Sequence, residues 1–121
     1  MNLKILDCEL SVCKIKDTAE IPFQDDFVFV SKTDMELSLV CSTASVPKSY
    51  ITREDGWKSF RVEGILDFSL IGIVAKITGI LADNQISVFV VSTFNTDYIL
   101  IKSEELERAV LLMQDNGFTF F

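Results

Sequence analysis

The chain has 121 residues, of which 49% are hydrophobic and 24% charged, and its formal net charge is −7. This length supports one compact domain, because a chain of this size buries roughly two-thirds of its unfolded surface, and the composition excludes a disordered chain. The acidic balance without a Lys/Arg cluster excludes nucleic acid as a partner, and apolar runs of about a dozen residues are shorter than the roughly 20 that cross a membrane.

Three short strands are predicted in the N-terminal half. Their signals are alternating or continuous apolar residues over residues 9–15, 27–30 and 36–41. In the third strand, Leu37, Leu39 and Cys41 share one side. The connecting stretches are short and contain proline, so any helix within them would be a single turn.

A seam between the two halves is predicted at residues 53–56, where the sequence Arg-Glu-Asp-Gly is typical of a turn. Residues 57–62 follow with alternating large apolar and polar side chains, the pattern of a half-buried strand. Gly64 is expected to close this strand.

The first long helix is predicted from Leu70, with Asp67 or Ser69 as its N-cap and Asp83-Asn84 at its end. Its apolar positions follow the spacing of one helical face. These positions are Leu70, Ile73, Val74, Ile77 and Leu81.

Two strands follow this helix. Residues 86–94 and 97–101 are rich in β-branched and aromatic residues, and Asn95-Thr96 between them suits a tight hairpin connection.

A second helix and a last short strand over residues 118–121 complete the pattern. Ser103 is a natural N-cap for this helix, and Asn116-Gly117 is a C-cap signal. The apolar face of the helix continues through Leu106, Ala109, Val110 and Met113.

From residue 57 onward the predicted order is β-α-β-β-α-β. This order indicates a ferredoxin-like α+β fold, with four antiparallel strands and two helices on one face of the sheet. The N-terminal half repeats the scheme faintly, and we interpret it as a degenerate copy of the same unit. The predicted domains are therefore residues 1–56 and residues 57–121.

The residue types that most often carry catalysis are sparse. Histidine is absent, which removes the commonest general base and metal ligand. Cys8, Cys13 and Cys41 lack CxxC spacing, and such thiols are usually reduced in an intracellular chain. Asp7 and Glu9 interrupt the region where a signal peptide would be apolar. We therefore expect a cytoplasmic protein without catalytic residues, bound metal or cofactor.

The start of the first long helix is a candidate binding site. A helix N-terminus presents unpaired amide groups and partial positive charge to a carboxylate, and Gly72 leaves room there because it has no Cβ. A structural alternative stays open, in which Gly72 and Gly79 only let the helix lie close to the sheet or to a partner.

Residues 91–97 are a second candidate site. Their hydrogen-bonding residues are Ser92, Thr93, Asn95, Thr96 and Asp97. The same residue types also serve hairpin turns, which is the alternative interpretation. A zwitterion needs donors for its carboxylate and an acceptor for its ammonium group. The helix start would supply the donors, Asp97 or Asp67 the counter-charge, and Phe94 a wall of the pocket.

Five segments spread over nearly the whole chain carry a resemblance. They are LSVCKI (10–15), ELSLVC (36–41), GWKSFRVEG (56–64), LDFSLIGIVA (66–75) and STFNTDYILI (92–101). Their most specific part is the pattern D-F-S-L-x-G-I followed by S-T-[FY]-x-T-D-Y. These segments resemble the small bacterial ACT-domain proteins and the ligand-binding portion of the CASTOR-type arginine sensors.

This resemblance implies two ACT-like units in tandem and a ligand, an amino acid or a similar small zwitterion, bound at an interface between units. It implies that ligand contacts come from the glycine-containing helix start and from the S-T-aromatic segment. The matching residues are Leu70, Ile71, Gly72 and Ile73, then Phe94, Asn95, Thr96 and Asp97. Because the sensors have four ACT units and this chain at most two, a homodimer is expected, with helix 70–82 near the seam.

We therefore predict a non-catalytic regulatory module that binds an amino acid. The alternative is a protein-interaction or dimerisation module that has kept the fold and lost the ligand. In that case Leu70 or Phe94 would be turned inward and would fill the pocket.

Overall fold

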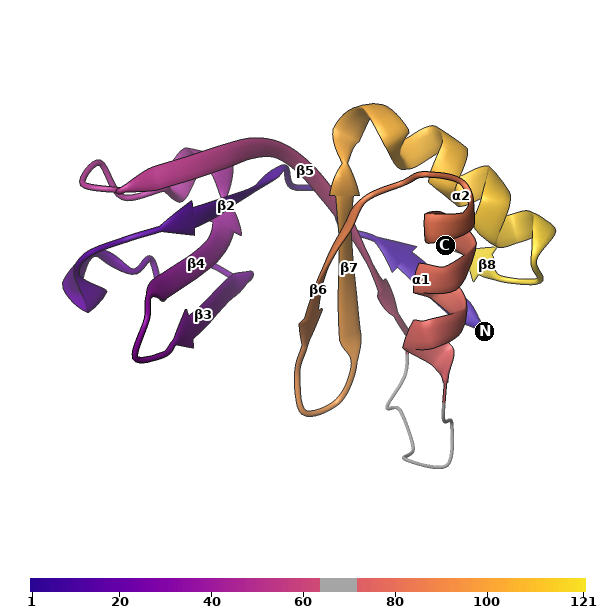
Figure 1. The fold of residues 1–121 in the computed structure, drawn as a ribbon, viewed down its shortest axis with the longest axis horizontal. Coiled ribbons are helices and arrows are strands. Elements are labelled where there is room, and N and C mark those ends of the chain that lie inside the picture. The colour runs from indigo at the N-terminus through magenta and orange to yellow at the C-terminus, as the bar shows by residue number, and fades with distance from the viewer. Residues whose placement is uncertain (64–71) are drawn as a thin grey trace. The chain divides into compact units, whose positions relative to one another are not determined.

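The computed structural model describes residues 1–63 and 72–121. The chain forms two compact units (Figure 1). The N-terminal unit is Cys8–Trp57, and the C-terminal unit combines Met1–Asp7 with Lys58–Phe121. Strand β5 (Thr52–Val62) contributes its first residues to one unit and its last residues to the other. The division into two ACT-like units at residues 56 and 57 stays a prediction.

The N-terminal unit is an antiparallel sheet in the order β3-β4-β2-β5. Its strands are β2 (Leu10–Lys14), β3 (Val28–Lys32), β4 (Leu37–Ser42) and the first part of β5. The three strands predicted from alternation are therefore confirmed. The stretches between them hold single 3-10 turns at Thr18–Glu20 and Thr43–Ser45, as their length and prolines indicate.

One face of these strands forms the core of the N-terminal unit. The fully or nearly buried members are Cys13, Ile15, Ile21, Leu39 and Cys41, with Leu37 packed beside them. The shared side predicted for the third strand is therefore confirmed. All three cysteines are free thiols, and a hydrogen bond with Cys13, together with burial, raises the pKa of Cys41, which keeps this thiol protonated.

The turn predicted at residues 53–56 is wrong, because these residues lie inside β5. Leu10 of β2 pairs with Trp57 but Val12 pairs with Glu54, so β5 carries one extra residue between the two pairs. Gly56 has a φ of +83°, the left-handed conformation that glycine supplies in one type of β-bulge. The turn-forming residue types of this stretch therefore build a bulge within a continuous strand.

The C-terminal unit has the predicted ferredoxin-like α+β fold. Its sheet order is β6-β7-β5-β1-β8 among the described strands. The elements are β1 (Asn2–Ile5), the last part of β5, α1 (Ile73–Asp83), β6 (Val88–Ser92), β7 (Asp97–Lys102), α2 (Leu106–Asp115) and β8 (Thr119–Phe120). From β5 onward this is the β-α-β-β-α-β order predicted from the sequence.

Strand β1 is not predicted by the sequence pattern, and it changes the sheet. It lies between β5 and β8, antiparallel to β5 through Leu3 and Val62 and parallel to β8 through Leu3 and Phe120. The sheet is therefore mixed rather than wholly antiparallel, because β1 and β8 both run opposite to β5.

Both helices bury one face in the core of the C-terminal unit, and they contact each other (Figure 1). The buried helical residues are Ile77 and Leu81 of α1 and Ala109 and Met113 of α2. They pack with strand residues such as Leu3, Phe60 and Ile99. The predicted apolar faces are confirmed at these positions.

The start of α2 differs from the prediction. Ser103 begins a 3-10 turn, Ser103–Glu105, and the α-helix starts only at Leu106, without a side-chain cap from Glu105. The predicted helix ends are confirmed, because Asn84 and Asn116 are the C-caps of α1 and α2.

The hairpins of the two units are copies of one structure. Strands Val28–Lys32 and Leu37–Ser42 with turn Thr43–Ser45 correspond, 60 positions later, to Val88–Ser92, Asp97–Lys102 and Ser103–Glu105. Their registers also match. At the tips, the hydroxyls of Thr33 and Thr93 accept hydrogen bonds from the amides of Glu36 and Thr96. This repetition supports the interpretation of the N-terminal unit as a degenerate copy.

Candidate functional site

Hydrogen bonds between Thr93 and Thr96 close the tip of the β6–β7 hairpin. The Thr93 amide donates to the Thr96 carbonyl at 2.8 Å, and the Thr93 hydroxyl donates to the same oxygen at 3.0 Å. The hairpin is confirmed, with Phe94 and Asn95 at its exposed tip rather than Asn95-Thr96. Part of the polar chemistry of residues 91–97 therefore serves the turn itself, which was the alternative interpretation.

Asp97 lies at the first position of β7, paired with Ser92 of β6. The Ser92 hydroxyl donates to Oδ1 of Asp97 at 2.6 Å. Within the part of the chain that the structure describes, Oδ2 of Asp97 accepts no hydrogen bond. The carboxylate is thus oriented by one neighbour and has a second oxygen for an ammonium group.

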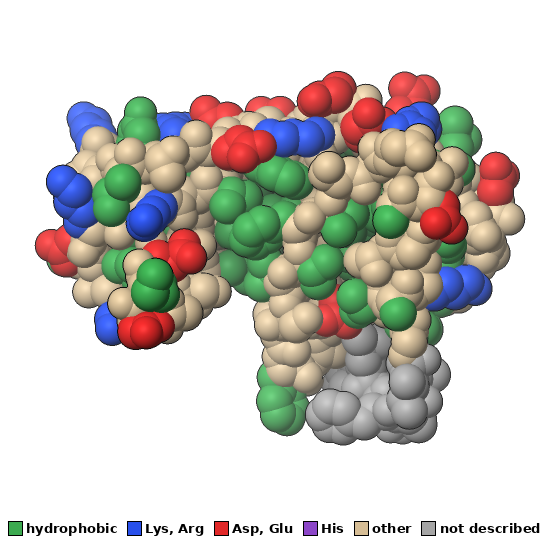
Figure 2. Space-filling model, in the orientation of Figure 1, with side chains coloured by type: hydrophobic (Ala, Val, Ile, Leu, Met, Phe, Trp, Pro, Cys, Tyr) green, Lys and Arg blue, Asp and Glu red, His purple; other side chains and the backbone are tan. Residues whose placement is uncertain are grey.

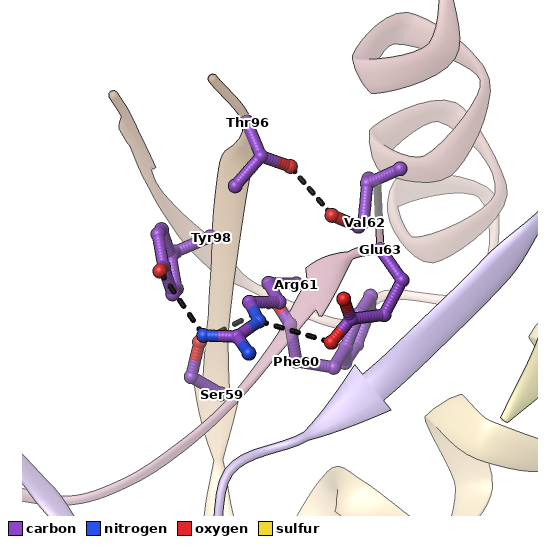
Figure 3. A network of polar contacts seen from close by, with 7 residues as sticks. All are labelled: Ser59, Phe60, Arg61, Val62, Glu63, Thr96 and Tyr98. Atoms are coloured by element: carbon purple, nitrogen blue, oxygen red, sulfur yellow. Dashed lines mark hydrogen bonds and ion pairs between the residues drawn. The ribbon is translucent and has the colours of Figure 1, made fainter. Parts of the chain in front are cut away.

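Thr96 ties the start of β7 to the end of β5 (Figure 3). Its hydroxyl donates to the carbonyl of Val62 at 2.6 Å. On the same strand, Arg61 donates from Nη1 to the Tyr98 hydroxyl at 3.4 Å and from Nε to Oε1 of Glu63 at 3.2 Å. The hydrogen bond with Tyr98 contributes most to raising the pKa of Arg61. Arg61 is therefore a fixed cation in this network.

The sequence analysis did not single out Arg61, Glu63 or Tyr98. The signal for Arg61 is the alternation of residues 57–62. It places Phe60 and Val62 in the core and Arg61 on the opposite side of the strand. A partly buried arginine on such a strand requires polar partners.

Helix α1 begins at Ile73. Its N-cap is Gly72, which has no side chain and so forms no side-chain capping hydrogen bond. The predicted caps Asp67 and Ser69 lie outside the described residues. Gly72 has a φ of +86° and is exposed. Its carbonyl accepts from the Lys76 amide at 2.8 Å. The first amides of the helix, from Ile73 onward, are those that a carboxylate would use.

Close packing of the helix does not explain its glycines. A Cβ added at Gly72 or at Gly79 would meet nothing within 4 Å. Among the described residues, neither glycine therefore has a neighbour at packing distance that requires it, which speaks against the interpretation that both let α1 approach the sheet; the interpretation that they let α1 lie close to a partner stays a prediction. Gly72 is instead required by its left-handed backbone conformation.

The structure places the remaining predicted residues as follows. Ile73 is half-buried and packs against the core, and Asn95 is exposed. Phe94 is 96% exposed. Leu70 and Ile71, like Asp67, lie outside the described residues. The end of β5, the start of α1 and the β6–β7 tip lie toward the same end of the C-terminal unit (Figure 1).

No group of three or more His, Cys, Asp or Glu side chains in residues 1–63 and 72–121 is placed to hold a metal ion. No helix in these ranges is long and apolar enough to cross a membrane.

Family models match both parts of the chain. The model of the ACT domain matches residues 52–115. A second model, described as an N-terminal domain, matches residues 9–49.

A curated relative is the cytosolic arginine sensor for mTORC1 subunit 1 of Rattus norvegicus. It is 37% identical over 59 residues, which cover 48% of this chain and 18% of the sensor. The chain thus spans less than a fifth of the length of this relative.

Solved structures support the fold over nearly the whole chain. A protein of Agrobacterium tumefaciens is 31% identical with a TM-score of 0.89, covering 99% of this chain and 91% of that protein. The ligand-free regulatory subunit of aspartate kinase from Thermus thermophilus has a TM-score of 0.65 at 9% identity, over 93% of this chain and 95% of the subunit. The second likeness shows the fold alone.

Proposed function

The chain belongs to the ACT domain family, and on this basis we propose that it is a non-catalytic regulatory module that binds an amino acid or a similar small zwitterion. ACT domains are regulatory modules that bind small molecules. The similarity to an arginine sensor supports this class of ligand.

The observation that carries the proposal is that the start of α1 and the β6–β7 tip, next to the carboxylate of Asp97, lie toward one end of the C-terminal unit (Figure 1). The first turn of α1, which receives no side-chain cap from its N-cap Gly72, offers amide donors and partial positive charge for a carboxylate. Oδ2 of Asp97 offers an acceptor for an ammonium group. Gly72, Ile73, Asn95, Thr96 and Asp97 are the described residues of this proposed site, while Asp67, Leu70 and Ile71 stay predictions.

The alternative, an interaction module without a ligand, predicts that Phe94 or Leu70 is turned inward. Phe94 is instead 96% exposed, so its side chain fills no pocket of its own unit. Leu70 lies outside the described residues, so this part of the alternative stays a prediction. The exposure of Phe94 allows it to close a site formed with another unit.

We also propose that the protein acts in the cytoplasm and as a homodimer. The name of the rat relative describes a cytosolic protein, and this chain spans only 18% of it. A second copy would supply the ACT units that the chain itself lacks.

A thermal-shift screen with each of the twenty amino acids tests the ligand proposal. Binding to the native state alone stabilises it by about 2.7 kcal/mol at a ligand concentration of roughly 100 times Kd, which raises the melting temperature on the order of 10 °C for a domain of this size. Asp97→Ala is expected to abolish the shift caused by binding at the C-terminal site, because it removes the counter-charge of the ammonium group.

Asp83→Ala is the matched control, since Asp83 is an exposed acid at the far end of α1. It should keep the full ligand-induced shift. If all twenty amino acids are inert at millimolar concentration, or if Asp97→Ala responds like the unchanged chain, the proposal is wrong.

A further inference from the structure

The N-terminal unit has a pocket of about 420 Å³ that the proposed function does not use. It lies between the end of β2, where the chain leads into the Thr18–Glu20 turn, and the tip of the β3–β4 hairpin. This volume falls within the roughly 300–1,000 Å³ that is typical of small-molecule sites.

The position of this pocket corresponds to that of the proposed site in the C-terminal unit. The β3–β4 tip is the copy, 60 positions earlier, of the β6–β7 tip that carries Asp97. Strand β2 pairs with β4 as β5 pairs with β7. The pocket therefore occupies the place in the N-terminal unit that the proposed amino-acid site occupies in the C-terminal unit.

Charged side chains of both signs line the pocket. Lys14, Lys16 and Lys32 are exposed, and none of them is within ion-pair distance of a carboxylate in the described ranges. Asp34 and Glu36 of the hairpin tip line it as well, and so does Asp17 beside Lys16, all likewise without an ion pair there; Asp17 accepts a hydrogen bond from the Ala19 amide at 2.9 Å. Figure 2 shows basic and acidic side chains interspersed over this unit. Oppositely charged groups that stand apart around one hollow are complementary to a zwitterion.

The remaining lining is apolar. Ile15 is buried and Leu37 half-buried, and Met35 is 80% exposed at the rim. Binding of an aliphatic group over an exposed methionine is favourable, because it removes apolar surface of both groups from water.

We propose that the N-terminal unit holds a second ligand site, which takes an amino acid with an aliphatic side chain. The three lysines bind the carboxylate, Asp34 and Glu36 bind the ammonium group, and Ile15, Leu37 and Met35 contact the side chain. The ligand class parallels the proposed function, but the site has its own residues and does not depend on Asp97.

Titration of the 15N-labelled full chain with leucine, isoleucine and valine, followed by NMR, tests this inference. For at least one of the three, we expect saturable shifts of the amides of residues 14–18 and 33–37. Two single-charge analogues of leucine, 4-methylpentanoate without the amine and 3-methylbutylamine without the carboxylate, should bind at least about tenfold more weakly, because each loses one set of charge-assisted hydrogen bonds.

The double variant Lys16→Ala with Lys32→Ala should weaken binding by about tenfold. Both lysines are exposed, so the fold is retained, and the unchanged amide spectrum of the C-terminal unit checks this. Lys48→Ala is the matched control, because Lys48 is an exposed lysine of the same unit outside the pocket, and it should bind like the unchanged chain.

Three results would overturn the inference. The first is that the amides of residues 14–18 and 33–37 do not shift with any of the three amino acids. The others are that either analogue binds as tightly as leucine, or that the double variant binds as tightly as the unchanged chain. Amides 92–97 report separately on the site of the proposed function. Shifts confined to residues 92–97 would contradict this inference and leave the proposed function standing. Shifts confined to the N-terminal unit would support this inference and show that these three amino acids do not use the C-terminal site, whose own test is the thermal-shift screen with all twenty.

Discussion

Gly56 and Gly79 differ in backbone conformation: glycine is favourable at position 56 and unfavourable at position 79. An added Cβ would meet nothing within 4 Å at either position. Gly56 has a φ of +83° at the bulge of β5, a conformation that costs a residue with a Cβ roughly 1–2 kcal/mol. Gly79 lies inside helix α1, where glycine is less favourable than alanine. The backbone alone therefore sets the sign of a substitution at each site.

We predict that Gly56→Ala lowers the free energy of unfolding by about 1–2 kcal/mol and that Gly79→Ala raises it by about 0.5–1 kcal/mol. Urea unfolding followed by circular dichroism measures both changes. Each variant serves as the control for the other, because both add the same methyl group without a clash. A destabilised Gly79→Ala would contradict the prediction that helix propensity alone sets the sign of this change.

At the scale of elements, the two helices share one design. Each presents an apolar stripe to the core of the C-terminal unit and a mostly polar or small-residue face away from it, with Leu111 as the exposed apolar residue of α2. The stripe was predictable because helical periodicity repeats over several turns. The helix starts were not, because Gly72 and the turn at Ser103–Glu105 depend on how the preceding chain enters the helix.

Leu81→Ala in α1 is expected to lower the free energy of unfolding by about 2–5 kcal/mol, because it leaves a cavity in the core. Leu81 is fully buried, whereas Leu111 of α2 is 58% exposed. The matched change Leu111→Ala should alter stability by no more than about 0.5 kcal/mol. Denaturant midpoints compare the two variants directly. Equal losses would contradict the assigned helix faces.

At the scale of the whole molecule, β5 belongs to both compact units. Residues 53–56 looked like a turn because Asp and Gly are frequent in turns, yet long-range pairing with β2 keeps them in a strand. Strand β1 likewise gains its place only from partners that are distant in the sequence, β5 and β8.

The homodimer proposal also belongs to this scale. Sedimentation equilibrium at tens of micromolar should give twice the mass of one chain, with or without amino acids. Gly79→Arg should shift this equilibrium to the monomer, because helix 70–82 is expected near the seam and Gly79 has open space around it. Gln114→Arg, at an exposed position of α2, is the control and should stay dimeric. A monomeric unchanged chain would contradict the proposal.

The sequence by itself determined the elements whose signal is local. Alternation and helical spacing identified every strand but β1, both helices and the ferredoxin-like order, and the resemblance identified the ACT family. The tertiary structure decided the bulge at Gly56, the insertion of β1, the network of Arg61 with Tyr98, and the pocket of the N-terminal unit. Each of these depends on hydrogen bonds or packing between residues far apart in the chain, and no local pattern encodes such pairings.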